Sequence, residues 1–171
     1  MKKVLLTSSL ALLFLVVTAL SIGAVEIGAS PPDIQLKDID GRDFRLSDHK
    51  GELLILKLAT TWCPTCRQQN AEFHELAEFL KEKNIRIVEV FLQDSEKMVR
   101  DYLAGEKFDS PFNAMLDNGQ ALSAYNVYLI PRVLLIDRDF LVMRDGNILT
   151  AQQIKAEFEK VPTAPVSSDG R

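Results

Sequence analysis

The sequence predicts an α/β fold in which a central mixed β-sheet is flanked by helices. Residues 53–59 form an apolar run broken only by Lys57, and residues 85–92 form a second stretch with the character of a buried strand. Between these stretches, apolar residues recur at the spacing of one helix face: Phe73, Leu76, Ala77 and Leu80. A strand, a helix that ends at Lys83-Asn84 and a second strand together predict a parallel pair with a right-handed crossover.

A β-hairpin is expected on the N-terminal side of this unit. Apolar and polar residues alternate over residues 34–36 and again over residues 44–46. The two segments flank Asp40-Gly41, a dipeptide typical of hairpin turns. Lys50-Gly51 indicates a further turn before the first long strand.

The second half of the chain carries weaker but consistent patterns. Residues 95–104 predict a helix with Ser95 as its N-cap. The pattern further predicts a short strand at Met115-Leu116, a helical turn over 120–125, strands over 133–136 and 140–143 joined around 137–139, and a closing helix over 151–161.

The N-terminus has the composition of an export signal. Lys2 and Lys3 precede an uncharged run over residues 4–25, and Gly23-Ala24 provides small residues for cleavage after Ala24. The alternative is an uncleaved anchor, because these 22 residues as a helix would span roughly 33 Å. The two lysines should stay on the cytoplasmic side in either case. We therefore expect an extracytoplasmic protein.

These features divide the chain into one folded domain and its flanks. The segments are a signal peptide or N-terminal anchor (1–24), a linker (25–32), the folded domain (33–161) and a disordered tail rich in Pro, Ser and Thr (162–171). With 47% apolar residues and a formal net charge of −4, the composition is that of a globular protein without a basic patch for nucleic acid. We expect a monomer that contacts a membrane only if the N-terminal segment is retained.

The chemistry is expected at the two cysteines of the chain, Cys63 and Cys66. They follow the first long strand directly, and Pro64 between them suits the first turn of a helix. The unpaired N–H groups of that helix start would stabilise a thiolate at Cys63, the expected exposed nucleophile. Cys66 lies almost one turn later, deeper in the protein, and could resolve a mixed disulfide between Cys63 and a substrate.

Two other interpretations of the cysteine pair were weighed. A structural disulfide that closes so small a loop would restrain the unfolded chain only weakly. A zinc or copper site would need more ligands, and the other soft donors are His49, His74 and a few methionines. The sequence therefore favours a redox-active disulfide, with no metal and no separate cofactor.

From Pro31 to Val161 the chain resembles the thioredoxin superfamily, in particular its extracytoplasmic TlpA/ResA/CcmG-type branch. The resemblance rests on Pro32-Asp33 with the Asp40-Gly41 hairpin, on Leu46-Ser47-Asp48 before Lys50-Gly51, on Trp62-Cys63-Pro64-Thr65-Cys66-Arg67, and on Ile130-Pro131 leading into residues 133–137. It implies a thioredoxin-like fold with an N-terminal β-hairpin. Trp62, Pro64 and Thr65 would then support the active site.

The resemblance also implies how a substrate would bind. Pro131 would be a cis-proline beside the cysteines, and the backbone of Ile130 would pair with an extended segment of the substrate. Trp62 would shield the disulfide and shape the docking surface. A proline at a strand start and a tryptophan at a strand end would also be compatible with purely structural roles.

Two positions depart from the family pattern. Six residues before the first cysteine, thioredoxins often carry a buried acid and this branch often has Asn, but the residue here is Lys57. A lysine there must be neutralised, paired or snorkelling, and a cation near the cysteines would make the pair more oxidising. Three residues after the second cysteine the branch often has Glu, and here Gln69 takes its place. Glu72 or Glu75 would then be substitutes for the proton-transfer carboxylate.

The leading hypothesis is thiol–disulfide exchange on protein substrates. The resemblance implies a reductant that receives electrons from a membrane protein and serves cytochrome c maturation. A disulfide oxidase or isomerase is an alternative, although a large helical insertion of the DsbA type is lacking. A peroxiredoxin-like peroxidase is a second alternative, because Thr60 stands three residues before Cys63, but Leu56 replaces the expected upstream proline. A Sco-like copper carrier is a third, although its Cys-X-X-X-Cys spacing and distal histidine are not matched.

Overall fold

The computed structural model describes residues 25–162. The predicted signal peptide or anchor over 1–24, and the predicted tail beyond Pro162, lie outside these residues. No helix between residues 25 and 162 combines the length and the apolar character needed to cross a membrane.

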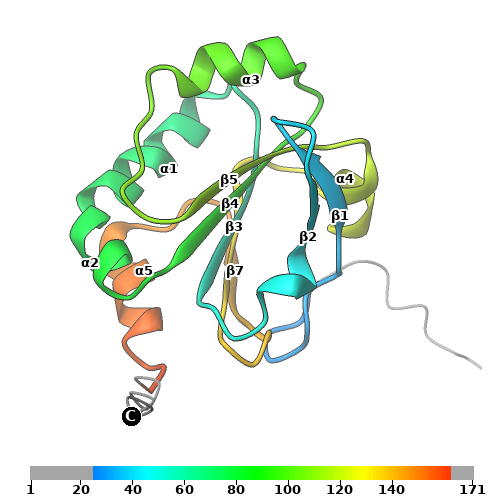
Figure 1. The fold of residues 1–171 in the computed structure, drawn as a ribbon. Helices are drawn as coiled ribbons and strands as arrows, with labels where there is room; N and C mark the ends of the chain where they lie inside the picture. Colours follow the sequence, from blue (N-terminus) through cyan, green and yellow to red (C-terminus); the bar gives the residue numbers. More distant parts are fainter. Residues whose placement is uncertain (1–24, 163–171) are drawn as a thin grey trace, which may run out of the picture.

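A seven-stranded mixed sheet forms the centre of the molecule (Figure 1). Its strand order is β2-β1-β5-β4-β3-β6-β7, and β4 runs parallel to both of its neighbours, whereas all other pairs are antiparallel. The strands are β1 (Gln35–Asp38), β2 (Asp43–Arg45), β3 (Leu54–Ala59), β4 (Arg86–Phe91), β5 (Phe112–Leu116), β6 (Arg132–Ile136) and β7 (Val142–Gly146). The predicted mixed sheet with its N-terminal hairpin is confirmed.

Helices cover both faces of the sheet. They are η1 (Leu46–His49), α1 (Pro64–Glu75), α2 (Ala77–Glu82), α3 (Glu96–Leu103), α4 (Gln120–Ala124) and α5 (Ala151–Phe158). Figure 1 shows α1, α2 and α5 on one side of the sheet and α4 on the other. The core is divided in the same way, because one apolar cluster joins the sheet to α1, α2 and α5 and another joins it to the hairpin and α4.

Strand β3 lies in the middle of the sheet and is buried along its whole length. Because side chains alternate across a strand, Leu54, Leu56 and Leu58 face the hairpin and α4. Ile55 faces the helices α1, α2 and α5. Lys57 and Ala59 share this second face, so the strand delivers one buried charge to the side on which the cysteines lie.

Several local predictions are confirmed. The pair β3–β4 is parallel, and α1 and α2 form the crossover between these strands. The Ser95 side chain accepts a hydrogen bond from the Met98 N–H at the start of α3. The predicted closing helix is present as α5, and Thr150, which was not predicted as a cap, caps it in the same manner with the Gln153 side chain bound in return to the Thr150 N–H.

Several element boundaries differ from the predictions, and three of the differences have a clear physical reason. The first crossover helix is interrupted at Leu76, where the turn tightens and the Leu76 N–H bonds to the Phe73 carbonyl oxygen. Strand β5 begins at Phe112 rather than at Met115, because it pairs with β4 along its whole length. Strand β7 begins at Val142 rather than at residue 140, because Phe140 has a φ of 63° and forms part of the preceding turn.

The segment predicted as a linker, residues 25–32, is attached to the sheet. The Gly28 N–H donates to the Val142 carbonyl oxygen at 2.8 Å, and the Val142 N–H donates to the Ala29 carbonyl oxygen at 2.9 Å. Val25 also packs against the apolar core on the hairpin side. This part of the linker thus extends the edge of the sheet next to β7.

Candidate active site

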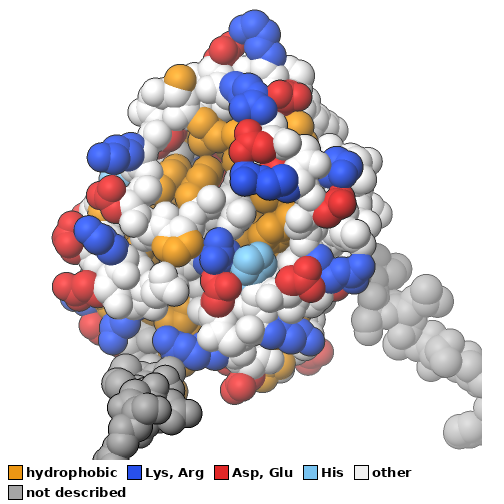
Figure 2. Space-filling model, in the orientation of Figure 1, with side chains coloured by type: hydrophobic (Ala, Val, Ile, Leu, Met, Phe, Trp, Pro, Cys, Tyr) orange, Lys and Arg blue, Asp and Glu red, His pale blue; other side chains and the backbone are white. Residues whose placement is uncertain are grey.

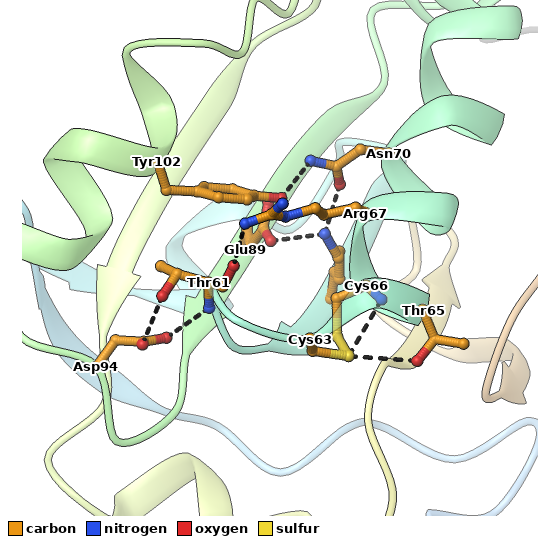
Figure 3. The surroundings of a disulfide bond; sticks show 10 residues. Thr61, Cys63, Thr65, Cys66, Arg67, Asn70, Glu89, Asp94 and Tyr102 are labelled. Atoms are coloured by element: carbon orange, nitrogen blue, oxygen red, sulfur yellow. Dashed lines mark hydrogen bonds and ion pairs between the residues drawn. A yellow bond between two sulfur atoms is a disulfide. The ribbon is translucent and has the colours of Figure 1, made fainter.

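The cysteine pair lies where β3 gives way to α1. Cys63 is the N-cap of α1, with Pro64 in the first turn, and its Sγ accepts a hydrogen bond from the Cys66 N–H at 3.2 Å (Figure 3). Cys63 and Cys66 form a disulfide with a Cα–Cα distance of 5.2 Å. The sulfur therefore lies against the unpaired amides of the helix start, as predicted. The same amides and the helix dipole would stabilise a thiolate there after reduction.

Both cysteines are largely covered. The exposed fraction is 4% for Cys63 and 0% for Cys66, and Ala59 and Ile130 pack around them. Cys63 was expected to be exposed, and in the disulfide form this expectation is wrong. The physical reason is that the disulfide turns the Cys63 sulfur onto the start of α1 and towards its neighbours. Cys63 is nevertheless the more accessible of the two cysteines.

Thr65 and the loop before Cys63 support the pair. The Thr65 Oγ1 lies 3.3 Å from the Cys63 Sγ. Asp94, in the loop after β4, accepts hydrogen bonds from the N–H and the Oγ1 of Thr61 at 2.9 and 2.8 Å. Arg67 donates to the Thr61 carbonyl oxygen at 3.2 Å. Asp94 was missed by the sequence reasoning, because nothing in its local pattern relates it to a loop 33 residues away.

Exposed apolar side chains adjoin both the cysteines and Pro131 in the chain. Trp62, next to Cys63, is 60% exposed, and Tyr128 and Leu129 are 84% and 66% exposed. Tyr128 and Leu129 directly precede the Ile130–Pro131 peptide bond, which is cis as the resemblance implies. Pro131 itself is buried, and Ile130 contacts the cysteine pair. The cysteines and the cis-proline are thus brought together, and Tyr128 and Leu129 are additional residues that the sequence reasoning did not single out.

Lys57 is fully buried and is paired with Glu89. The two residues are direct neighbours across the parallel strands β3 and β4, and the Lys57 Nζ lies 2.6 Å from the Glu89 Oε1. Lys57 also donates a hydrogen bond to the Asn70 Oδ1. Of the outcomes considered for Lys57, the structure shows the paired one. Glu89 was missed because the sequence reasoning treated residues 85–92 only as a buried strand.

A chain of polar contacts continues from this pair to α3. The Asn70 Nδ2 donates to the Tyr102 hydroxyl oxygen at 2.8 Å, and the Arg67 guanidinium lies 5.9 Å from the centre of the Tyr102 ring. Burial raises the pKa of Tyr102, with Glu89 as the next largest cause. Burial also raises the pKa of Glu89, against the opposing effect of Lys57. The charges near the cysteines thus belong to one connected network.

Gln69 and Glu72 have structural contacts instead of facing the disulfide. The Gln69 side-chain amide donates to the Leu149 carbonyl oxygen at 3.0 Å and accepts from the Leu149 N–H at 2.8 Å. Glu72 accepts from the Ala151 N–H at 2.6 Å, at the start of α5. Both polar ends of the Gln69 amide are thus bound to the backbone before α5, and its support of the active site stays a prediction. Glu72 is likewise bound at the start of α5.

The two histidines considered as metal ligands lie in separate surface networks. His49 stacks on Phe44 and contacts Glu52, whereas His74 contacts Glu106 and stacks on Phe108. Between residues 25 and 162, no three side chains of His, Cys, Asp or Glu form a cluster suited to a metal ion.

A disulfide at the start of the helix that follows a central strand, with a cis-proline segment packed against it, defines a thioredoxin-like thiol–disulfide oxidoreductase. The comparison with protein families agrees with this class. The AhpC/TSA family model matches residues 27–150, and the chain belongs to this family.

The curated relatives and solved structures that the chain resembles include thiol-disulfide oxidoreductases of the ResA and StoA type. Thiol-disulfide oxidoreductase ResA of Geobacillus kaustophilus (strain HTA426) is 31% identical over 138 residues, which cover 80% of this chain and 76% of that protein. Sporulation thiol-disulfide oxidoreductase A of Bacillus subtilis (strain 168) is 28% identical over 143 residues, covering 77% and 81% of the two chains. The crystal structure of StoA from Bacillus subtilis superimposes with a TM-score of 0.60 at 25% identity and covers 76% of this chain and 98% of that one. The predicted enzyme class and the resemblance to the ResA-type branch are confirmed.

Proposed function

We propose that this enzyme is an extracytoplasmic reductant of protein disulfides. The observation that carries the proposal is the placement of Cys63 on the N-terminal amides of α1, beside a cis-proline segment and next in sequence to an exposed Trp62. A thiolate in this position can attack a disulfide, and Cys66 lies close enough to complete the exchange. The reducing direction is supported by the similarity to ResA-type relatives and by the resemblance to this branch.

The surface next to the cysteines supports a polypeptide substrate. Trp62, Tyr128 and Leu129 are among the six large apolar side chains that are exposed in residues 25–162. Exposed aromatic and aliphatic side chains are typical of surfaces that bind other proteins. The backbone of Ile130 would add an extended substrate segment as a neighbouring strand.

Location and electron supply complete the proposal. The basic start and the apolar run over residues 4–25 support export across a membrane, with or without retention of the segment as an anchor. We infer that a membrane protein reduces the disulfide again after each cycle and that the protein acts as a monomer. Apocytochrome c is the proposed substrate, and it rests on the resemblance alone.

Trapping of mixed disulfides in cells tests the proposal. In Cys66→Ser, Cys63 can attack a substrate but the mixed disulfide cannot be resolved, so we expect covalent complexes that a reductant dissolves. Cys63→Ser is the matched control and should trap none. Identification of an apocytochrome among the captured proteins would support the proposed pathway. Equal trapping by both variants would contradict the roles of the two cysteines.

Two further measurements separate the alternatives. Consumption of peroxide with a dithiol as reductant should be no faster than in the Cys63→Ser variant, and a clear excess would instead support a peroxidase. The reduced protein, mixed with cuprous ion and passed over a desalting column, should not retain one copper per chain. Stoichiometric retention would support a copper carrier.

A further inference from the structure

The Lys57–Glu89 pair lies on the same face of the sheet as the cysteines. Lys57 is two residues before Ala59 on the same face of β3, and Ala59 packs against both cysteines. Asn70, which accepts a hydrogen bond from Lys57, lies four residues after Cys66 and therefore on the same side of α1. In Figure 3, Asn70 and Glu89 lie together on one side of the disulfide. The buried charges thus lie on the same side of the sheet as the cysteine that must lose a proton, linked to its helix through Asn70.

Within the described part of the chain, only one of the two oxygens of the Glu89 carboxylate has a hydrogen-bond partner. Its Oε1 binds Lys57, but its Oε2 is buried and has no hydrogen-bond partner among residues 25–162. The free energy needed to remove two charges from water is about as large as their electrostatic attraction. A buried pair of this kind therefore contributes little stability compared with apolar residues. A free carboxylate oxygen at a fully buried position is therefore an acceptor available for a proton.

We propose that Glu89 accepts the proton of the Cys66 thiol during resolution of the mixed disulfide and that Lys57 positions its carboxylate. This inference rests on the proposed function, because it concerns the second step of thiol–disulfide exchange. Glu89 would do from β4 what the family pattern assigns to an acid in β3 or to a glutamate in α1. At those two positions this chain has Lys57 and Gln69, and Gln69 is bound to the backbone of Leu149.

Resolution of the mixed disulfide follows the attack of Cys63 on the substrate. The Cys63 thiolate has attacked one sulfur of the substrate disulfide, and the other substrate sulfur has left as a thiolate and taken a proton from water. The Cys66 thiol then transfers its proton to the Glu89 Oε2, and the Cys66 thiolate attacks the Cys63 Sγ. The Cys63–substrate bond breaks as the Cys63–Cys66 bond forms. The second substrate sulfur leaves as a thiolate and is protonated, and Glu89 returns its proton to solvent.

The charges around Glu89 keep its carboxylate basic enough for this role. Lys57 faces it from β3 and lowers its pKa, but burial, together with Asp94 and Glu106, raises it. Tyr102 faces the same site from α3, and Arg67 of α1 lies over the Tyr102 ring. The net effect is a raised pKa for Glu89, closer to that of a thiol and therefore better suited to proton exchange with it.

The test compares two double variants, neither of which leaves a buried charge without a counter-ion. Lys57→Met with Glu89→Gln replaces the ion pair by neutral residues and deletes the acid. Lys57→Glu with Glu89→Lys keeps an ion pair and moves the acid to β3. Arg86→Met with Glu52→Gln is the matched control. Arg86 begins β4, Glu52 lies two residues before β3, and the two side chains lie 2.7 Å apart at the end of these strands away from the cysteines.

The measurement is stopped-flow fluorescence of Trp62, the single tryptophan, after mixing reduced protein with excess of a peptide disulfide. We expect the concentration-dependent phase, attack by Cys63, to change much less than resolution, because each double variant leaves the net charge of the site as it is. The concentration-independent phase, resolution by Cys66, should slow on the order of 100-fold at pH 7 in the neutral variant. The difference should narrow towards pH 9, where the thiol ionises unaided. The swapped variant and the control should resolve at the wild-type rate or close to it.

A neutral variant that resolves as fast as the wild type across this pH range would overturn the role of Glu89. If that variant does not fold, the wild type still decides: the ¹³C-detected titration of the Glu89 carboxyl should differ between the oxidised and reduced protein, and identical curves would refute the coupling. A wild type that does not react with the peptide disulfide would contradict the proposed function instead, and the titration would remain a separate test of Glu89.

Discussion

At the residue scale, the site depends on a charge in the middle of a buried strand. Lys57 lies among apolar neighbours in β3, and its Nζ is bound by Glu89 and Asn70 with no exposure to solvent. The sequence indicates that such a lysine must be neutralised, paired or snorkelling, but it cannot show which of the acids downstream would pair with it. Glu89 becomes the partner only through the parallel register of β3 and β4, which places the two residues side by side.

Removal of Lys57 alone should destabilise the protein in a pH-dependent way. Lys57→Met leaves Glu89 buried without its counter-ion, and breaking such a pair costs about 3–5 kcal/mol. Burial already raises the folded pKa of Glu89 above its ordinary value of 4.5, and the loss of Lys57 raises it further. A raised folded pKa means that stability is retained below pH 4.5 and is lost as the pH rises through the folded pKa. Urea unfolding of variant and wild type from pH 4.5 to 8 should therefore show a deficit that grows with pH.

The partly exposed pair of Arg86 and Glu52 supplies the comparison for this measurement. The side chains of Arg86 and Glu52 are 21% and 29% exposed, so Arg86→Met should cost about 1 kcal/mol or less. A deficit for Lys57→Met that is as small as this, or that shrinks as the pH rises, would show that Glu89 does not depend on Lys57.

At the element scale, local patterns predict the parts of the fold that local contacts determine. The Asp40-Gly41 hairpin and the cap at Ser95 involve residues close together in the chain. The cysteine pair could be placed correctly for the same reason, because the end of a strand and the start of a helix are adjacent in sequence. The contacts of Asp94 with Thr61 and of Glu89 with Lys57 span more than thirty residues, so they depend on strand register and could not be predicted.

The loop between β3 and α1 gives a prediction at this scale. Asp94→Ala removes both hydrogen bonds that Thr61 donates, and leaving a part-buried N–H unpaired costs about 1–3 kcal/mol. We expect a lower free energy of unfolding and a lower fluorescence anisotropy of Trp62, which follows Thr61 in the loop. Asp94→Asn, which keeps one acceptor oxygen, should recover part of both effects. An unchanged anisotropy in Asp94→Ala would show that this loop is held by other contacts.

At the scale of the whole molecule, the surface of residues 25–162 carries charged side chains of both signs and six exposed large apolar side chains. On the face seen in Figure 2, acidic and basic side chains alternate and apolar ones show between them. Trp62, Tyr128 and Leu129 adjoin the cysteines and the cis-proline in the chain, whereas Met98 and Ile148 belong to other parts of it. Substitutions near the cis-proline can therefore be compared with substitutions of exposed apolar residues elsewhere on the protein.

Polar substitutions on this surface should affect protein substrates more than small ones. Tyr128→Ser and Leu129→Ser remove apolar contact area next to Ile130, and truncation of such a contact costs on the order of 1–2 kcal/mol of binding, about 5- to 30-fold in affinity. We expect kcat/KM for the reduction of a disulfide-containing protein to fall by about this factor through KM, while the rate with oxidised glutathione is unchanged. Met98→Ser and Ile148→Ser are matched controls and should leave both rates unaltered. Equal losses with the protein and with glutathione would place the effect in the chemistry of the cysteines, because a docking contact cannot reduce the rate of a substrate too small to reach it.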